Sequence, residues 1–513
     1  MEKFTQIEQL RKQSNMSQEQ LAELLGISRQ TVSEWERGIA YPSVEKLLFL
    51  SKIFNVSLDY IITGKEFNAN KYSVLNVNNK QQLTKKDLKE KGYSSKEINM
   101  TLNSDEFKYT LLSHTDSLLF GRNGKYYVST KENAPIGNSL VVASAGAGKS
   151  RCFLKPNICQ AIKRGESLII NDVAGEELYF LKEKLEENGY KIQCIDFLSK
   201  ATSYGFLQDI PDDIFMAEKY IRIIYNNLIE PYETTKENYF NQLMFTIFHA
   251  AVSYILFSKQ TNFKKTLYSV SKLLTQYTCK ELIKLLEDDT ENKFNDYNIL
   301  KSQNIDILER IYTTLTITLS GYFRNISDTS KNKNIPIYNE EPFKYNITDV
   351  YKEKIAVFLI SPCYFTNDHP ISNLFKLYIN MLTYLLHEER NEIKQKTFIC
   401  LDEFANLAQP INNFSLLLKN SYSLKVSIVV IIQSITQLEY FYNLKEIQEY
   451  FDNIVYLRSS NEIDLERFSK MFDISINELK YNKEINMYVK RHDEIVCVQK
   501  INDVEKVFNL PNR

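Results

Sequence analysis

The feature that most constrains this chain is an apolar strand followed by a loop of small residues and then a helix. Ser139-Leu140-Val141-Val142 has the pattern of the strand, residues 143–150 form the loop, and residues 151–163 predict the helix, with a kink at Pro156. The loop ends in Gly146-Ala147-Gly148-Lys149-Ser150, which matches a phosphate-binding loop. Consecutive backbone N–H groups in such a loop, together with a helix N-terminus, form a cradle for phosphate oxygens. The order of strand, loop and helix therefore predicts an α/β domain that binds a nucleoside triphosphate.

The residue types of this loop suggest a role for each position. Lys149 is expected to reach the β- and γ-phosphates of ATP, and the Ser150 hydroxyl is expected to ligate Mg²⁺. Ala143 stands where the pattern has glycine, and its Cβ would be unfavourable if that position needed a positive φ. The alternative to a nucleotide site is a Gly/Ala turn that precedes a helix by chance. The predicted nucleotide contacts are Gly146, Ala147, Gly148, Lys149, Ser150 and Arg151.

A second apolar strand supplies the acidic partner of the loop. Thr397-Phe398-Ile399-Cys400-Leu401 ends in Asp402-Glu403, so a parallel strand would present both carboxylates at its C-terminal edge. Asp402 is then the second predicted Mg²⁺ ligand beside Ser150, and Glu403 would polarise the attacking water. Asp402 could instead be an acidic cap of a following helix. The phosphate-binding loop upstream favours the catalytic interpretation.

Polar residues also end two further predicted strands. Gln433 follows Val429-Val430-Ile431-Ile432, where its side chain could report the γ-phosphate to the rest of the fold, and Asp172 ends the strand that begins at residue 167. Either residue could be a plain cap; we favour a functional role for Gln433 and leave Asp172 open. An arginine from a neighbouring subunit could complete the site, and Arg458 and Arg151 are candidates. The predicted catalytic residues are Lys149, Asp402, Glu403 and Gln433.

The rhythm of the predicted elements divides the chain into domains. Residues 1–65 have the pattern of short amphipathic helices, and residues 66–116 form a linker that is mostly rich in Asn, Lys and Gln. Strands alternate with helices in residues 117–210 and 331–513, whereas residues 211–330 have helical spacing and hardly any strand pattern. We therefore expect an α/β ATPase domain with a parallel sheet, an all-α insertion, and a small all-α domain before them.

Composition limits the partners and the compartment. The formal net charge is −1 over 513 residues, so any contact with nucleic acid must come from local patches. Seven scattered cysteines are typical of reduced, buried thiols. The longest apolar run, residues 244–257, is interrupted by polar residues and is too short to cross a bilayer. We expect a cytoplasmic protein with no transmembrane segment of its own, which would reach the inner face of the membrane only through partners.

Five motifs lie at residues 119–126, 149–158, 171–176, 401–407 and 433–438. They occur in the order found in the TraG-like conjugative coupling proteins of type IV secretion, and this part of the chain resembles that family. The resemblance covers residues 118–473 and implies a RecA-like ATPase that acts as a hexameric ring. It further implies that the ring pumps DNA and passes a relaxase–DNA substrate to the secretion channel. Val173-Ala174 stands where the family has Pro-Lys, and the family's usual N-terminal transmembrane helices have no counterpart in this sequence.

In the N-terminal part of the chain, Ser17-x-x-Gln20 is a capping box that opens one helix, Ser28 opens the next, and Val32 and Trp35 place apolar side chains inward. With this spacing, residues 7–64 resemble the phage-repressor-type (Cro/CI-like) helix-turn-helix. The resemblance implies that the helix of residues 28–37 lies in the major groove of DNA. Residues 1–65 contain eight Lys/Arg and eight Asp/Glu, hence a net charge of zero, so a docking module without DNA binding is the alternative. The predicted DNA contacts are Gln18, Ser28, Gln30, Thr31, Ser33 and Arg37.

Three functions are consistent with these observations. The leading one is a DNA-tethered coupling ATPase that moves DNA during conjugative transfer, with a relaxase or relaxosome and secretion-channel proteins as partners. The second is a nucleotide-switched DNA-binding regulator of a mobile element, and the third is a defence or replication NTPase with the same fold. ATP hydrolysis that responds to DNA would favour the first, whereas slow turnover and dimers would favour the second.

Overall fold

The computed structural model describes residues 5–61 and 104–511 with gaps. The longer gaps are 62–103, 198–204, 230–238, 290–295, 324–345, 362–369, 405–409 and 481–485, and shorter ones of one to four residues lie elsewhere. The chain forms two compact units, residues 1–74 and 75–513, which are described separately. Most of the predicted linker and the predicted motif residues 405–407 lie outside the described residues.

The N-terminal unit contains the helices α1 (Thr5–Gln13), α2 (Gln18–Leu25) and α3 (Arg29–Glu36). The predicted capping box is confirmed, since Gln20 N donates to Ser17 Oγ at 3.1 Å and Ser17 N donates to Gln20 Oε1 at 2.8 Å. Small and branched side chains let the helices pack closely around one apolar core. That core contains Ile7, Leu10, Leu21, Ala22, Leu25, Val32, Trp35, Leu50 and Ile61.

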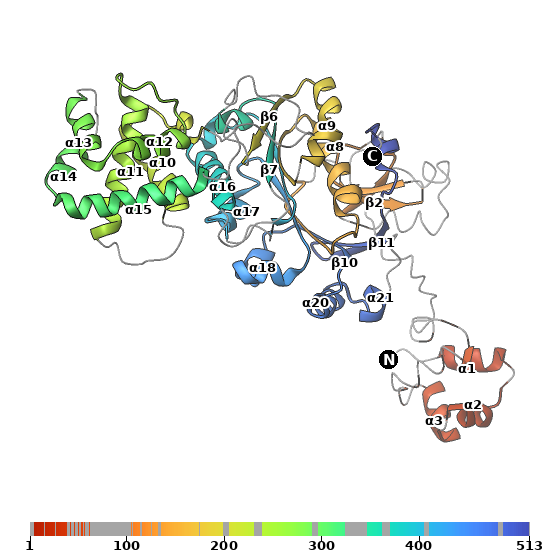
Figure 1. Cartoon of the computed structure of the whole chain (residues 1–513). Coiled ribbons are helices and arrows are strands. Elements are labelled where there is room, and N and C mark those ends of the chain that lie inside the picture. Colours follow the sequence, from red (N-terminus) through yellow and green to blue (C-terminus); the bar gives the residue numbers. More distant parts are fainter. Residues whose placement is uncertain are drawn as a thin grey trace. The chain divides into compact units, whose positions relative to one another are not determined.

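Figure 1 shows the second unit with its central sheet. The sheet has twelve described strands in the order β1-β3-β2-β12-β11-β10-β4-β9-β8-β5-β7-β6. The seven strands from β10 to β6 are parallel, as predicted, and the five from β1 to β11 extend the sheet in antiparallel fashion. The sheet is therefore mixed. Its strands are β1 (Phe107–Thr110), β2 (Leu119–Asn123), β3 (Tyr126–Thr130), β4 (Ser139–Ala143), β5 (Ser167–Val173), β6 (Lys191–Asp196), β7 (Ile355–Ser361), β8 (Thr397–Leu401), β9 (Val426–Ile432), β10 (Asn453–Arg458), β11 (Asn486–Arg491) and β12 (Glu494–Gln499).

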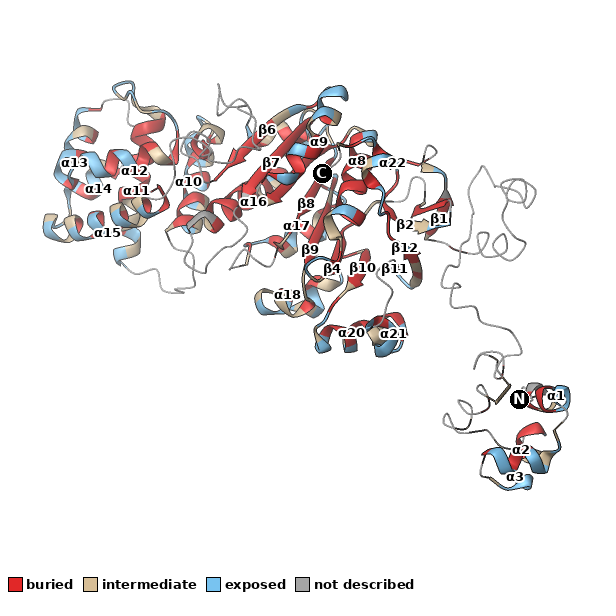
Figure 2. Ribbon diagram, turned by 45° about the vertical axis from the view of Figure 1, so that its right-hand side comes forward, coloured by how far each residue is buried: buried red, intermediate tan, exposed pale blue. Residues whose placement is uncertain are grey.

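Helices cover both faces of the parallel strands, which explains why those strands are apolar without alternation. In β4, Leu140 and Val142 belong to one buried core, whereas Val141 and Ala143 belong to the core of the opposite face. The central strands are accordingly buried along their length (Figure 2). The second core is completed by η2 (Ser150–Leu154), α8 (Lys155–Arg164), α9 (Glu176–Glu187) and α22 (Val504–Phe508).

The first core continues from the sheet into the helical insertion. Asn380 of α16 (Pro370–Glu388) donates to Asn227 Oδ1 at 2.6 Å, and Asn373 of the same helix donates to the Tyr322 hydroxyl at 2.9 Å. The helices of the insertion gather beyond α16 (Figure 1). They are α10 (Ile214–Leu228), α11 (Tyr239–Phe257), α12 (Leu267–Gln276), α13 (Cys279–Asp288), α14 (Asp296–Lys301) and α15 (Ile305–Phe323).

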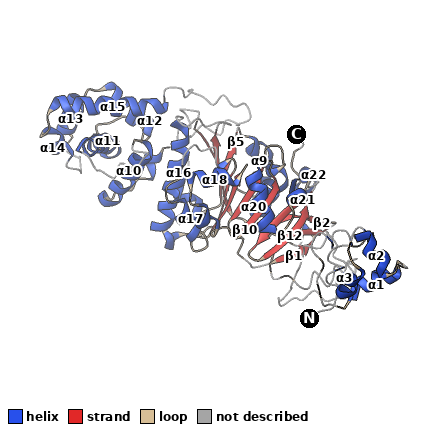
Figure 3. Cartoon of the chain, turned by 90° about the horizontal axis from the view of Figure 1, so that it is seen from below, coloured by secondary structure: helices blue, strands red, loops and turns tan. Residues whose placement is uncertain are grey.

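The remaining helices connect the strands of the second half of the chain in sequence. Figure 3 shows helices flanking the sheet. Short 3₁₀ turns occur at η3 (Phe206–Asp209), η4 (Ile347–Tyr351) and η5 (Arg390–Glu392). The helices are α17 (Phe414–Asn420), α18 (Ile435–Phe441), α19 (Leu444–Gln448), α20 (Glu462–Phe472) and α21 (Ile476–Lys480).

The structure differs from the sequence expectation at three places. Phe107–Thr110, predicted as linker, forms edge strand β1 and pairs with β3. The hairpin of β11 and β12 was not predicted at all. The first turn of the predicted helix after the phosphate-binding loop is a π-helix, in which Lys155 N donates to Ser150 O. The α-helix α8 follows it directly, with Pro156 in its first turn.

One described helix, α11, is long and apolar enough to cross a membrane by length and composition. The apolar run of residues 244–257 is part of this longer helix, so the expectation that it is too short to cross a bilayer does not hold for the helix as a whole. However, 61% of its apolar window is buried inside the fold, and its residues pack in the core that the insertion shares with the sheet. A buried core helix passes the same test of length and composition.

Candidate nucleotide site

The backbone of the predicted phosphate-binding loop turns at two glycines. Gly146 and Gly148 have φ of 71° and 87°, a region that side chains disfavour. Ala147 N donates to Ser144 O at 3.0 Å and closes the turn between them. Ala143 is the last residue of β4 and is not among the described residues with positive φ. Its Cβ therefore causes no backbone strain of the kind that the sequence pattern raised.

The loop lies against the acidic pair at the end of β8. Ser150 Oγ donates to Asp402 Oδ2 at 3.1 Å, and Lys149 Nζ lies 3.6 Å from Asp402 Oδ1. Lys149 also pairs directly with Oε1 of Glu403. The structure therefore brings together the four residues that the sequence assigned to phosphate, metal and water.

Burial sets the electrostatics of this cluster. It raises the pKa of Asp402, an effect that Lys149 and the Ser150 hydroxyl oppose. Burial likewise lowers the pKa of Lys149, and Asp402 opposes that shift. Each charge is costly alone in this environment, so each stabilises the other. A bound polyphosphate would give Lys149 a new negatively charged partner, and the cation bound with it would give Asp402 a new positively charged one.

The oxygens of Ser150 and Asp402 fit a magnesium ion. Two neighbouring ligands of an octahedral Mg²⁺ at 2.0–2.1 Å lie roughly 3 Å apart. The separation of 3.1 Å between Ser150 Oγ and Asp402 Oδ2 matches that spacing. Mg²⁺ keeps several waters and is held by one or two protein oxygens plus phosphate. Among the described residues, no group of three or more His, Cys, Asp or Glu could hold a metal ion by itself.

Gln433 reaches the same cluster from β9, the strand between β4 and β8. Its Nε2 donates to Glu403 Oε2 at 2.8 Å. Behind it, Gln437 accepts from the backbone N–H groups of Gln433 and Ser434 at 3.0 and 3.1 Å. The wholly buried Asp464 accepts from Ser434 Oγ at 2.9 Å and anchors the start of α18. Gln433 thus links the acidic pair to the start of α18. Asp464, which belongs to the same network of contacts, was not predicted from the sequence.

The end of β5 has a structural role. The buried Asp172 accepts the backbone N–H groups of Glu177 and Leu178 at 2.9 and 2.8 Å, so it caps the first turn of α9. Burial raises the pKa of Asp172 to about 7. Its neighbour Asn171 donates to the backbone carbonyl of Asp402 at 2.5 Å and holds the acidic turn in place. Of the two interpretations left open for Asp172, the structure shows the cap.

The two candidate arginines contact their own chain. Arg458 lies on β10 in register with Ala143, and its Nε lies 3.4 Å from Ser144 Oγ at the start of the loop. Arg151 has a side chain 54% exposed and pairs with Glu505 at 2.7 Å. Lys500, which the sequence analysis did not consider, donates to the carbonyl of Ala147 at 3.0 Å. Its contact links residues far apart in the sequence, so no local pattern indicates it.

The predicted DNA-contacting residues lie on and around α3. Ser28 is the N-cap, and its Oγ accepts from Thr31 N at 3.1 Å. Gln30 is exposed, and its amide donates to Glu34 at 3.2 Å, while Arg37 donates to Ser33 O at 3.2 Å.

Gln18 differs from the others because it lies on α2 and its side chain contacts another helix, α3. Its amide donates at 2.8 Å to Glu36, whose carboxylate forms a buried ion pair with Arg11. Gln18 thus helps to hold the N-terminal end of α2 against the C-terminal end of α3.

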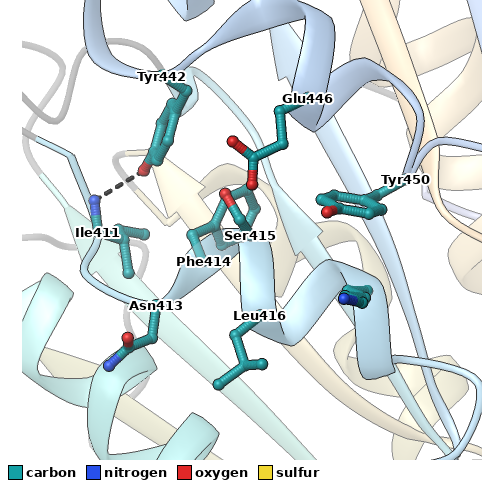
Figure 4. A pocket seen from close by; sticks show the side chains of 9 residues that line it. Ile411, Asn413, Phe414, Ser415, Leu416, Tyr442, Glu446 and Tyr450 are labelled. Carbon is teal, nitrogen blue, oxygen red and sulfur yellow. Dashed lines mark hydrogen bonds between the residues drawn. The ribbon is translucent and has the colours of Figure 1, made fainter.

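A pocket of about 470 Å³ lies elsewhere, around α17, α19 and the residues that flank α19 (Figure 4). The Tyr442 hydroxyl accepts from Ile411 N at 2.7 Å at one side of it. None of the nucleotide-site residues lines this pocket. Its lining residues are Ile411, Asn413, Phe414, Ser415, Leu416, Lys419, Tyr442, Glu446 and Tyr450.

Comparison with known proteins assigns both units to families. The family model "Type IV secretory system Conjugative DNA transfer" matches residues 76–472, and the family model "Helix-turn-helix" matches residues 7–61. The N-terminal unit is 46% identical over 66 residues to the HTH-type transcriptional activator BcrR of Enterococcus faecalis, which covers 13% of this chain and 32% of that protein. It is 38% identical over 56 residues to the HTH-type transcriptional regulator YobD of Bacillus subtilis, which covers 11% and 50%. The match thus spans between a third and a half of these relatives.

Solved structures of the bacterial conjugative coupling protein TrwBdeltaN70 share the fold of the second unit. The unbound monoclinic form has a TM-score of 0.54 and 14% identity, covering 76% of this chain and 89% of that one. The trigonal form with sulphate has a TM-score of 0.51 and 14% identity, covering 71% and 86%.

Proposed function

The chain belongs to the conjugative DNA transfer family of type IV secretory systems, and on that premise we propose that it is an ATP-driven motor that moves DNA. The observation that carries the proposal is one cluster at the C-terminal edge of three neighbouring parallel strands, β4, β9 and β8. These strands deliver the loop with Lys149 and Ser150, then Gln433, then Asp402 and Glu403.

ATP with Mg²⁺ is the proposed ligand of this cluster. Lys149 would leave Glu403 to bind the β- and γ-phosphates, while Ser150 and Asp402 would hold Mg²⁺. Glu403, freed from Lys149, would accept a proton from the attacking water, and Gln433 would keep that carboxylate in position. A solved plasmid coupling protein TrwB is in complex with the GTP analogue GDPNP, which supports a nucleoside triphosphate in this fold.

The N-terminal unit is proposed to bind DNA. Its relatives are named as a transcriptional activator and a regulator, and α3 presents Gln30, Thr31 and Ser33 beside the exposed Arg37. Sequence-specific binding by this unit would load the motor at a defined site.

Partners and location follow from the family and are proposals for this chain. A ring of identical subunits, of which six is the proposed number, would surround the DNA. A relaxase or relaxosome would supply the substrate, and type IV secretion proteins at the inner face of the membrane would receive it. The protein itself is proposed to be cytoplasmic.

Phosphate release tests the motor. We expect the purified chain to hydrolyse ATP with Mg²⁺, hydrolysis to rise with single- or double-stranded DNA, and Lys149→Ala to abolish it. Lys182→Ala, which removes a lysine from the surface of α9, is the matched control and should hydrolyse at the wild-type rate. If neither single- nor double-stranded DNA changes the rate of ATP hydrolysis, the proposal that the protein is a DNA translocase is refuted. ATP-dependent changes in the affinity of the N-terminal unit for DNA, with dimers in place of rings, would support the regulator instead.

A further inference from the structure

Lys500 follows β12 and packs against the phosphate-binding loop with only 7% of its surface exposed. Its Nζ donates to the carbonyl of Ala147 at 3.0 Å, between the two glycines with positive φ. We infer that Lys500 is a positioning residue of the nucleotide site, which acts on bound phosphate through the peptide that joins Ala147 to Gly148. This inference rests on the proposed ATP site.

Peptide geometry gives Lys500 this reach. In a trans peptide the carbonyl and the following N–H point in opposite directions. An ammonium held on the Ala147 carbonyl therefore fixes the Gly148 N–H on the opposite side, among the N–H groups that such a loop turns toward phosphate. The N–H of Ala147 itself is already donated to Ser144 O, so the Gly148 N–H is the donor that Lys500 controls.

Charge adds to the orienting effect. A hydrogen bond from a cation to a carbonyl polarises the whole peptide and makes its N–H a stronger donor. Because Lys500 is buried beside the loop, water screens this charge poorly. The effect is directed at the phosphate tail and involves neither base nor ribose. It should therefore be the same for ADP, ATP and pyrophosphate.

Neighbouring contacts hold Lys500 where it is needed. Asn502 accepts from Cys152 Sγ at 3.4 Å, and Glu505 pairs with Arg151 at 2.7 Å. On the loop itself, a Cβ at Gly148 would lie 3.0 Å from Cys152 Sγ, so the loop has little room to move there. The segment after β12 thus braces the loop and the π-helical turn that follows it.

A binding experiment on the full chain separates positioning from general stability. We compare Lys500→Met with Lys184→Met, which removes a lysine that donates to another backbone carbonyl of the same C-terminal segment, Phe508 O at 2.8 Å. Both variants should lower the unfolding temperature measured without nucleotide. Titration with fluorescent mant-ADP should show affinity about tenfold weaker for Lys500→Met, the loss expected for a charge-assisted hydrogen bond, and unchanged for Lys184→Met. Inorganic pyrophosphate, as competitor, should lose the same factor.

Other results of these titrations would contradict the proposed role of Lys500. If Lys500→Met binds mant-ADP with wild-type affinity, or if Lys184→Met loses as much affinity, the inference is overturned. Lys500 would then only stabilise the fold. A loss for mant-ADP without a loss for pyrophosphate would overturn it too, because the base or ribose would then be involved. If Lys500→Met does not fold, Lys500→Gln, whose shorter side chain lacks the charge, is measured against Lys184→Gln with the same expectations. A wild-type chain that binds no mant-ADP refutes the proposed function itself.

Discussion

Gln433 Nε2 donates to Oε2 of Glu403 at 2.8 Å, while Oε1 of the same carboxylate pairs with Lys149. Glu403 has a φ of 51°, which is uncommon for a residue with a Cβ, and its N–H donates to the Asp402 side chain at 2.8 Å. Two groups therefore fix the carboxylate, and a third fixes the backbone of the same residue. Backbone strain of this kind concentrates at functional sites.

The first prediction concerns the charge of that carboxylate. Glu403→Gln should reduce ATP hydrolysis by roughly 10²- to 10⁴-fold, because an amide cannot accept the proton of the attacking water. ATP should bind as tightly as in the wild type or more tightly, since Lys149 no longer has to leave an ion pair to reach phosphate. Phosphate release and mant-ATP titration measure the two effects separately.

Glu439→Gln is the control for this variant. Glu439 lies on α18 and pairs with Arg467 at 2.8 Å on the surface, so hydrolysis should not change. Wild-type turnover in Glu403→Gln would remove Glu403 from the catalytic residues.

The second prediction concerns the join between the antiparallel strands. A Cβ at Gly121 of β2 would lie 2.5 Å from the carbonyl of Gln499 and 2.7 Å from Val498 Cγ2. Gly121→Ala should therefore destabilise the second unit by about 1–3 kcal/mol. Gly321→Ala in α15 meets nothing within 4 Å and should stabilise by about 0.5–1 kcal/mol, because alanine favours the helix.

Urea unfolding followed by far-UV circular dichroism gives both values. Equal effects of the two substitutions would mean that the close approach of β2 to β12 does not constrain the fold.

The sequence predicts the parallel strands well because each is a short apolar run that both faces bury. It misses β11 and β12, since their turn at His492 and Asp493 lacks the Asn-Gly or Asp-Gly pattern of a tight hairpin. His492 nevertheless has a φ of 49° in that turn. Propensity alone does not reveal such a residue, because tertiary context decides it.

The same distinction holds at the site. Lys149, Ser150, Asp402, Glu403 and Gln433 stand in local motifs, so their residue types and spacing indicate them. Asn171, Asp464 and Lys500 act through contacts between distant segments that the sheet order brings together. No periodicity in the sequence records those contacts.

The third prediction concerns pH. Burial raises the pKa of Asp172 to about 7 from an ordinary value of 3.8. Between about pH 4 and pH 7 the folded protein therefore holds a proton that the unfolded chain releases, so the free energy of unfolding falls as pH rises through that window. Burial also raises the pKa of Glu177, which acts in the same direction.

Asp172→Asn tests this prediction. An asparagine accepts only one of the two N–H bonds of the α9 cap, so the variant should be less stable at every pH. As pH rises from about 4 to about 7, its unfolding temperature should nevertheless fall less than that of the wild type, because the titrating group is gone. A fall as large as in the wild type would show that Asp172 does not bind the proton.

The last prediction uses Trp35, the only tryptophan of the chain, which is 4% exposed in the core of the N-terminal unit. Its fluorescence therefore reports unfolding of that unit within the intact protein. Arg11 forms a bidentate pair with Glu36 at 2.6 and 3.1 Å, and both residues are less than a tenth exposed. Arg11→Met leaves the Glu36 carboxylate buried without its cation, at a cost on the order of 3 kcal/mol. A unit of this size has a small free energy of unfolding, so Trp35 should report that the N-terminal unit is unfolded at room temperature.

Arg29→Met is the control, because Arg29 pairs with Glu19 at 2.7 Å on the exposed side of the unit, with both side chains more than half exposed. Water screens that pair, so the Trp35 transition should stay close to that of the wild type. ATP hydrolysis without DNA should be unchanged in both variants, since the second unit has its own core and the whole nucleotide site. A native Trp35 signal in Arg11→Met would mean that Gln18 and the surrounding helix ends satisfy Glu36 without the arginine.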